Sequence, residues 1–114
     1  MDFLKQILSA IKETCGVQPE AFETYSTDSL PAITYTANRQ SDNGAVETWR
    51  LEIRATADTL LEALEIDRKI STLLVTVGDE PQFGCNPIVQ NGGGVMNPLG
   101  KSQAIAYYDI TKKS

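Results

Sequence analysis

The sequence predicts an α+β fold in which two helices pack on a mostly antiparallel sheet of three to four strands. Two stretches repeat apolar residues at intervals of three and four, as helices do, and three others alternate apolar with polar residues, as strands do. An Asn-Gly pair separates the first two alternating stretches. The expected order is α-β-β-α-(β)-β. A chain of 114 residues supports one hydrophobic core, so we expect a single domain over residues 1–114.

The first helix is expected over residues 2–15, where Phe3, Ile7 and Ile11 recur on one side. Gly16 follows at a position where glycine commonly ends a helix, because it adopts the left-handed conformation without a steric penalty. Residues 17–30 show no sustained period, and we expect them to form a loop over the surface.

A β-hairpin is expected after this loop. Apolar and polar residues alternate over 32–39 and again over 48–55, which is typical of strands with one buried face. The turn between them, residues 41–44, contains Asn-Gly, which favours the positive φ angles of tight turns. The side chains expected to face the core from the second strand are Trp49, Leu51, Ile53 and Ala55.

The second helix is expected over residues 58–77. Thr59 and Glu62 have the spacing of a capping box, in which a threonine side chain accepts a hydrogen bond from the backbone three residues later. The stripe expected to face the sheet comprises Leu60, Leu61, Leu64, Ile70, Leu73, Leu74 and Val77.

The C-terminal third combines a glycine-rich loop with a final strand. Glycine and proline are frequent over residues 78–101, which argues against regular structure there apart from a short strand around 87–90. The closing strand is expected over 102–111. Its two faces are both partly apolar, with Ala104, Ala106, Tyr108 and Ile110 on one and Ile105 and Tyr107 on the other. We therefore expect helix to cover the first face and a neighbouring subunit to cover the second.

Charge and composition argue against several function classes. The net charge is −5, and the basic residues are scattered along the chain, so direct nucleic-acid binding is disfavoured. No stretch is long and apolar enough to cross a membrane, and the first residues lack the features of a signal peptide. The sequence therefore predicts a cytosolic protein that does not bind membranes.

The chain lacks the residues that most catalytic schemes need. It contains no histidine, the commonest general base and metal ligand, and its cysteines, Cys15 and Cys85, have no metal-ligand spacing. We expect free thiols, no catalytic site, no metal and no cofactor. Gly100-Lys101-Ser102 matches the end of a phosphate-binding loop, but Val95 stands where its first glycine belongs and a strand follows instead of a helix.

Three features instead indicate contacts with other proteins: the two-sided final strand, an apolar tip on the glycine-rich loop, and a polar hairpin tip. The alternative is that these are ordinary loops with scattered apolar residues. The residues that we expect at an interface are Arg39, Asp42, Arg50, Val95, Met96, Leu99, Ile105 and Tyr107.

In the order and pattern of its elements, nearly the whole chain resembles the tail-terminator and tail-completion proteins of long-tailed bacteriophages and prophages, which include head-to-tail joining proteins. The segments that carry the resemblance are the two helices, the closing strand 104–110, the glycine-rich segment, Leu30-Pro31-Ala32-Ile33-Thr34-Tyr35 and Trp49-Arg50-Leu51-Glu52-Ile53-Arg54.

The resemblance implies an α+β subunit without a cofactor that assembles into a sixfold ring. Such a ring caps the tail tube, so its partners would be the tail tube protein and the head connector protein. It would assemble in the host cytoplasm and then remain in the virion. Another neck or head-completion role is equally compatible with the sequence. Alternatives from other classes are a monomeric module that binds a small ligand or regulates a partner, and an enzyme that uses carboxylates or Cys15 or Cys85.

Overall fold

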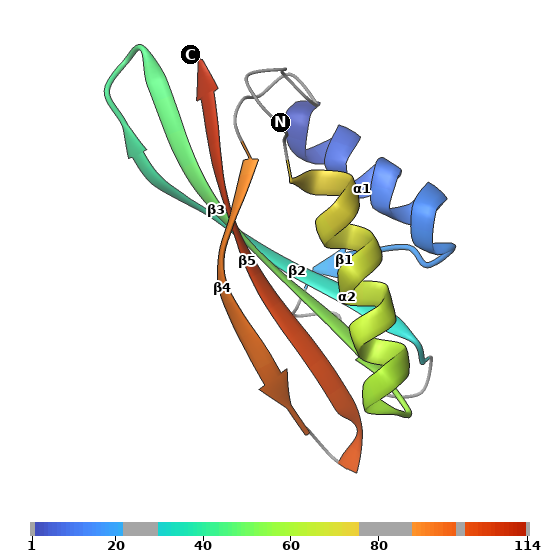
Figure 1. The fold of residues 1–114 in the computed structure, drawn as a ribbon. Coiled ribbons are helices and arrows are strands. Elements are labelled where there is room, and N and C mark those ends of the chain that lie inside the picture. The colour runs from blue at the N-terminus through green and yellow to red at the C-terminus, as the bar shows by residue number, and fades with distance from the viewer. Residues whose placement is uncertain (1, 22–29, 76–87, 98–99, 114) are drawn as a thin grey trace.

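The structure is a computed structural model of the chain, and it describes residues 2–21, 30–75, 88–97 and 100–113. Two helices lie on a five-stranded, mostly antiparallel sheet, which confirms the predicted fold class (Figure 1). The order is α-β-β-β-α-β-β. The elements are α1 (Asp2–Cys15), β1 (Glu20–Ala21), β2 (Ala32–Asp42), β3 (Val46–Ala57), α2 (Leu60–Leu74), β4 (Ile88–Met96) and β5 (Ser102–Lys113).

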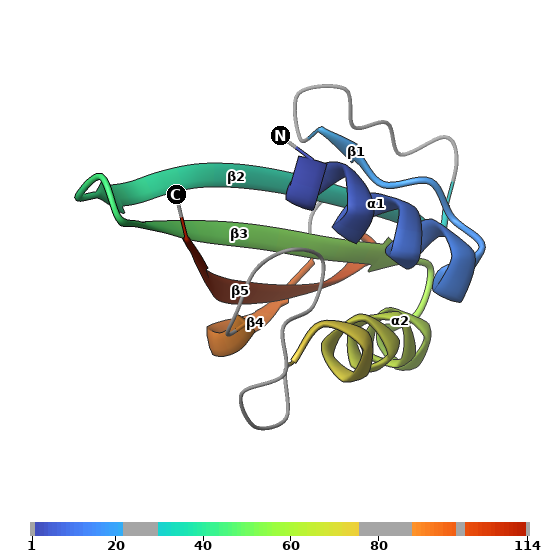
Figure 2. The same ribbon diagram turned by 90° about the horizontal axis from the view of Figure 1, so that it is seen from above.

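The strands lie in the order β1-β2-β3-β5-β4 across the sheet. The short β1 pairs with β2 in parallel, while β2–β3, β3–β5 and β5–β4 are all antiparallel. Both helices lie on the same side of the sheet, with α1 toward β2 and α2 toward β5 (Figure 2). The sheet therefore has a face that carries the helices, the helix face, and an opposite face that we call the outer face.

The hairpin of β2 and β3 is confirmed, and both strands are longer than the alternation predicted. The side chain of Asn43 shapes the turn, because its Oδ1 accepts hydrogen bonds from the backbone N–H groups of Ala45 (3.0 Å) and Val46 (2.8 Å). Gly44 adopts a φ of 87°, in the region that glycine tolerates. The end of the hairpin extends beyond α1 and α2, close to the C-terminal end of β5 (Figure 1).

The core lies between the helices and the helix face. From α1, Phe3, Ile7 and Ile11 are buried as predicted, and the Phe3 ring meets the ring of Trp49 edge to face, with 5.7 Å between centroids. Such pairs add to the free energy gained by burying the rings alone. The other large buried side chains include Ile33, Leu51, Ile53, Ile70, Leu74, Ile88, Tyr108 and Ile110.

Helix α2 begins as predicted but presents a different stripe to the sheet. Thr59 is its N-cap and accepts a hydrogen bond of 3.2 Å from the backbone N–H of Glu62. The buried residues are Ala63, Ile66, Ile70 and Leu74, whereas Leu60, Leu61 and Leu64 are exposed. The expected stripe was therefore wrong in its first turns.

A contact between small residues accounts for this difference. Ala63 packs with Ala57 and Ala104 in a small buried cluster, so the start of α2 approaches the sheet through alanines. Residues one or two positions apart on a helix point in different directions, so with Ala63 facing the sheet Leu61 and Leu64 point away from it. The predicted helical residues 76 and 77 lie outside the described residues.

One strand occurs where a loop was expected, and another is longer than the short strand predicted around 87–90. Glu20 and Ala21 pair with Thr34 and Tyr35, and nine residues of the glycine-rich segment form β4 against β5. Alternation could not reveal the full length of β4, because Gly92, Gly93 and Gly94 have no side chains to alternate. The remainder of the predicted loop, 78–87, lies outside the described residues.

Candidate interaction surfaces

The free edge of β4 carries exposed apolar side chains. Val95, which is 56% exposed, faces the helix side, and Met96 and Val89 are exposed on the outer side. The predicted exposure of Val95 and Met96 is confirmed, but they belong to a strand and not to a loop tip. Leu99, the third residue of the predicted tip, lies outside the described residues.

Exposed leucines at the start of α2 extend this apolar region. Val95 pairs with Ala104, and Ala104 packs against Ala63 of α2, so Val95 lies beside the first turns of the helix. Leu61 is 69% exposed there, and Leu60 and Leu64 are also exposed. We call Leu60, Leu61, Leu64 and Val95 the α2–β4 surface. The sequence could have predicted this surface. Ala63, Ile66, Ile70 and Leu74 already form a complete stripe at helical spacing, which leaves the three leucines outside the core.

The outer face of β5 is more enclosed than predicted. Ile105, which we expected at an interface, is only 8% exposed and offers little surface to a partner. Its cross-strand partner on β3 is Arg54, and its partner on β4 is Gly94, which has no side chain. Tyr107 is partly exposed, and its ring lies against the backbone of Gly92. Tyr107 therefore remains a candidate for an interface.

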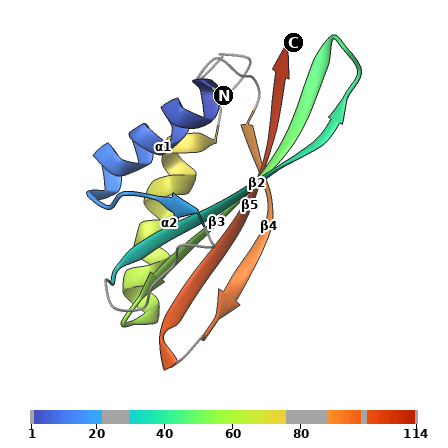
Figure 3. The same cartoon turned by 180° about the vertical axis from the view of Figure 1, so that it is seen from behind.

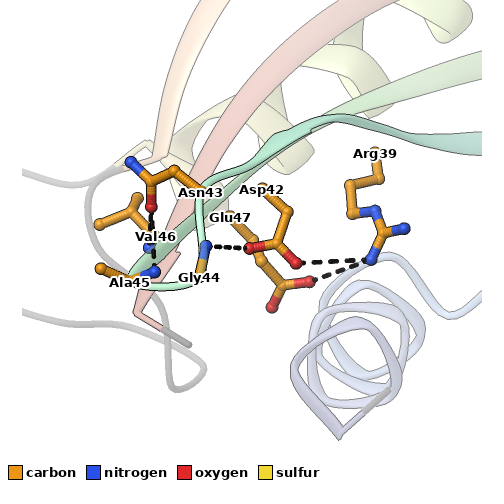
Figure 4. A network of polar contacts seen from close by, with 7 residues as sticks. All are labelled: Arg39, Asp42, Asn43, Gly44, Ala45, Val46 and Glu47. Atoms are coloured by element: carbon orange, nitrogen blue, oxygen red, sulfur yellow. Dashed lines mark hydrogen bonds and ion pairs between the residues drawn. The ribbon is translucent and has the colours of Figure 1, made fainter.

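The polar end of the hairpin is held by a small charge network (Figure 4). Arg39 lies 3.7 Å from Asp42 and 3.8 Å from Glu47, measured between charged atoms. Asp42 also accepts a hydrogen bond of 2.9 Å from the backbone N–H of Gly44. The Arg39 side chain is still 57% exposed, and exposed ion pairs contribute little to stability. Its guanidinium is accessible to a partner.

Arg50 does not join this network. Its Nε lies 3.3 Å from Oδ1 of Asp109, whose other oxygen accepts a hydrogen bond of 2.8 Å from the Asn91 side chain. Arg50 is adjacent to the buried Trp49 on β3 and therefore faces the outer side, whereas Arg39 pairs with Trp49 and faces the helix side. The predicted polar residues thus belong to two opposite faces.

A partly buried polar cluster joins α2 to the two last strands. Ser71 donates a hydrogen bond of 2.8 Å to the side chain of Gln90 on β4. Burial raises the pKa of Asp67, one helical turn earlier, and burial together with the negative charge of Asp67 raises the pKa of the Tyr108 hydroxyl. No cation contacts Asp67 among the described residues. This carboxylate is therefore partly removed from water without a compensating charge.

The described part of the chain offers little for metal or acid–base chemistry. It contains no group of three His, Cys, Asp or Glu residues that could hold a metal ion. Lys101, from the motif that resembles a phosphate-binding loop, instead donates a hydrogen bond of 2.8 Å to Asp58, and this bond raises the pKa of Lys101. Burial raises the pKa of the Cys15 thiol, which disfavours the reactive thiolate. Cys85 lies outside the described residues.

An open groove of about 550 Å³ lies between α1 and α2. Ligand sites are usually concave and mainly apolar with a few placed polar groups, and this groove presents mainly apolar surface although most of the residues that line it are charged or polar. They are Thr14, Glu65, Arg68, Lys69, Thr72 and Leu73.

None of the helices in the described ranges is both long and apolar enough to span a membrane. No protein-family model matches the sequence, and no curated protein is significantly similar to it. The observations that bear on function are therefore the surfaces described above.

Proposed function

We propose that the chain is a structural subunit of a phage or prophage virion, which assembles into a ring that ends the tail tube and joins it to the head connector. The observation that carries this proposal is the exposed apolar α2–β4 surface beside a strand edge. Large exposed apolar patches are uncommon on monomeric proteins and often mark an interface, and Leu60, Leu61, Leu64 and Val95 are all exposed. The order of the elements, which resembles that of tail-terminator proteins, gives the interface its context.

A ring places a physical demand on each subunit. Head-to-tail contacts need two different complementary patches, and the ring closes only if the rotation between neighbours is suitable. The α2–β4 surface is one candidate patch, and the hairpin with exposed Arg39 is a second. No cofactor, metal or nucleic acid enters this function, and the subunit would pass from the host cytoplasm into the virion.

Light scattering and electron microscopy of the purified chain test the proposal, alone and after addition of tail tubes from the phage or prophage that encodes it. We expect closed rings, either free in solution or at the ends of the tubes. A chain that stays monomeric at high concentration and does not bind the tubes would falsify this function.

A monomeric ligand-binding or regulatory module is the second candidate, and the groove between the helices is the observation that favours it. A thermal-shift screen with nucleotides, small anions and metal ions tests this function. A ligand at a hundred times its dissociation constant adds about 2.7 kcal/mol to the free energy of unfolding. Charge reversal of Arg68 in the groove should abolish a genuine shift caused by an anion.

A further inference from the structure

The sheet is open at two edges among the described residues. On one side, β4 is exposed from Val89 to Met96 and pairs only with β5. On the other side, β1 pairs only with Thr34 and Tyr35 of β2. Within the described part of the chain, residues 36–39, 41 and 42 of β2 therefore pair with β3 alone, and residues 38–42 are exposed. The two open stretches have similar lengths.

The strand directions allow one edge to pair with the other. The neighbours β2, β3, β5 and β4 alternate in direction, so β4 runs antiparallel to β2. The edges lie on opposite sides of the sheet (Figure 3). A second copy placed beside β4 in the same orientation would thus continue the antiparallel sheet with its own β2. Native sheets commonly protect their edges with charges or proline, but residues 89–96 contain neither.

The irregularities of the two edges fit one register. On the helix face, β2 presents Arg39 and then Asp42, because the strand is bulged between them. On the same face, β4 presents Gln90 and then Gly93, again across a bulge. Both pairs are three residues apart. When Arg39 of one copy is opposite Gly93 of the other, the bulged stretches 39–42 of β2 and 90–93 of β4 lie opposite each other. Ala37 is then opposite Val95.

Charge complementarity favours the same register. The hydrogen bond between Ser71 and Gln90 shows that α2 runs along β4, and Leu64, Asp67 and Ser71 lie on one side of this helix. Gly93 contributes no side chain between β4 and that side of α2. An arginine opposite Gly93 would therefore extend toward Asp67, the partly buried carboxylate that lacks a cation within the described parts of the chain.

We propose that β2 of one copy adds to the free edge of β4 of the next copy, with Arg39 of the first reaching Asp67 of the second. This inference rests on the proposed ring function and names the two surfaces that the ring would use. Strand addition supplies main-chain hydrogen bonds, and the side chains above and below the strand supply specificity. A two-fold pairing of β4 with β4 would leave β2 unpaired and bring no cation to Asp67.

Charge reversal tests the inference on the full chain. Arg39→Asp and Asp67→Arg should each weaken association at least about tenfold, because like charges then face each other across the interface. An equimolar mixture of the two variants should recover the oligomer, since every contact in it pairs residue 39 of one variant with the oppositely charged residue 67 of the other. Arg68→Asp, on the groove side of the same helix, is the matched control and should assemble like the wild type.

Analytical ultracentrifugation at equal subunit concentrations measures association, and circular dichroism checks that each variant is folded. If Asp67→Arg fails to fold, Asp67→Asn replaces it, and this variant should weaken association by less than the reversal at Arg39. A wild-type oligomer that tolerates Arg39→Asp, or single variants whose mixture does not recover, would overturn the edge pairing while leaving the ring function intact. A wild-type chain that never assembles, even with tail tubes, overturns both.

Discussion

Gly93 on β4 passes so close to the carbonyl oxygen of Ile105 on β5 that a β-carbon on Gly93 would overlap it. The neighbouring Gly94 has open space at the same position. The fit of β4 against β5 therefore requires a glycine at position 93 but not at position 94. This fit positions the free edge of the sheet.

Replacement of Gly93 by alanine should destabilise the fold. The oxygen it would meet belongs to the backbone of a central strand and cannot move away easily, so we expect a loss of about 1–3 kcal/mol in the free energy of unfolding. Gly94→Ala is the matched control and should change this free energy by less than about 0.5 kcal/mol. Urea unfolding followed by tryptophan fluorescence measures both. Equal losses in the two variants would contradict the close approach.

The sequence predicted the elements whose patterns are local. The stripe of Phe3, Ile7 and Ile11 identified α1, the Asn-Gly pair identified the hairpin turn, and Thr59 with Glu62 identified the start of α2. Each signal depends on residues a few positions apart, so it can be read without knowledge of the fold. The fold class followed from these elements.

What the sequence did not predict depends on contacts between distant segments. The sequence predicted only the first residues of β4, because the rest of this strand pairs with β5 through glycines that hide the alternation typical of other strands. Ile105 is buried on a strand that lies between β3 and β4, a place that only the strand order reveals. The exposed leucines of α2 were misassigned because Ala63, packed with Ala57 and Ala104, faces the sheet at the start of the helix in their place.

The cap of α2 provides a second prediction. Thr59→Ala removes the acceptor for the backbone N–H of Glu62 and should lower the free energy of unfolding by about 1 kcal/mol. Thr59→Asp retains an acceptor at the same place and should preserve stability. Thr72→Ala, an exposed threonine within the same helix, controls for the loss of a hydroxyl group. A Thr59→Ala variant as stable as the wild type would show that water replaces the cap without loss.

Asp67 should make the stability of the monomer depend on pH. Burial raises the pKa of Asp67 in the folded state above its ordinary value of 3.8, so the folded state binds the proton more tightly than the unfolded state does. Below pH 3.8 both states are protonated and there is no penalty. As the pH rises through 3.8 and then through the folded-state pKa, the folded state loses stability, because the charged carboxylate is partly buried.

Asp67→Asn should therefore be more stable than the wild type at pH 7, and the difference should shrink toward pH 3.5. Thermal unfolding at both values, at protein concentrations low enough to keep the chain dissociated, measures the difference. Glu65→Gln removes a charge from an exposed position of the same helix and serves as the control. If both variants gain the same stability at pH 7, the effect arises from the net charge of the helix and not from burial of Asp67.

The two sides of α2 should respond differently to truncation. Ile70 is almost completely buried against the sheet, so Ile70→Ala leaves a cavity and should lower the free energy of unfolding by about 2–5 kcal/mol. Leu61 is 69% exposed, so its replacement by alanine removes few contacts within the chain. Leu61→Ala should therefore change the free energy of unfolding by less than about 0.5 kcal/mol. Urea unfolding at low protein concentration gives both values for the monomer. A large loss for Leu61→Ala under those conditions would mean that this leucine is covered within its own chain, and the α2–β4 surface would then be smaller than described.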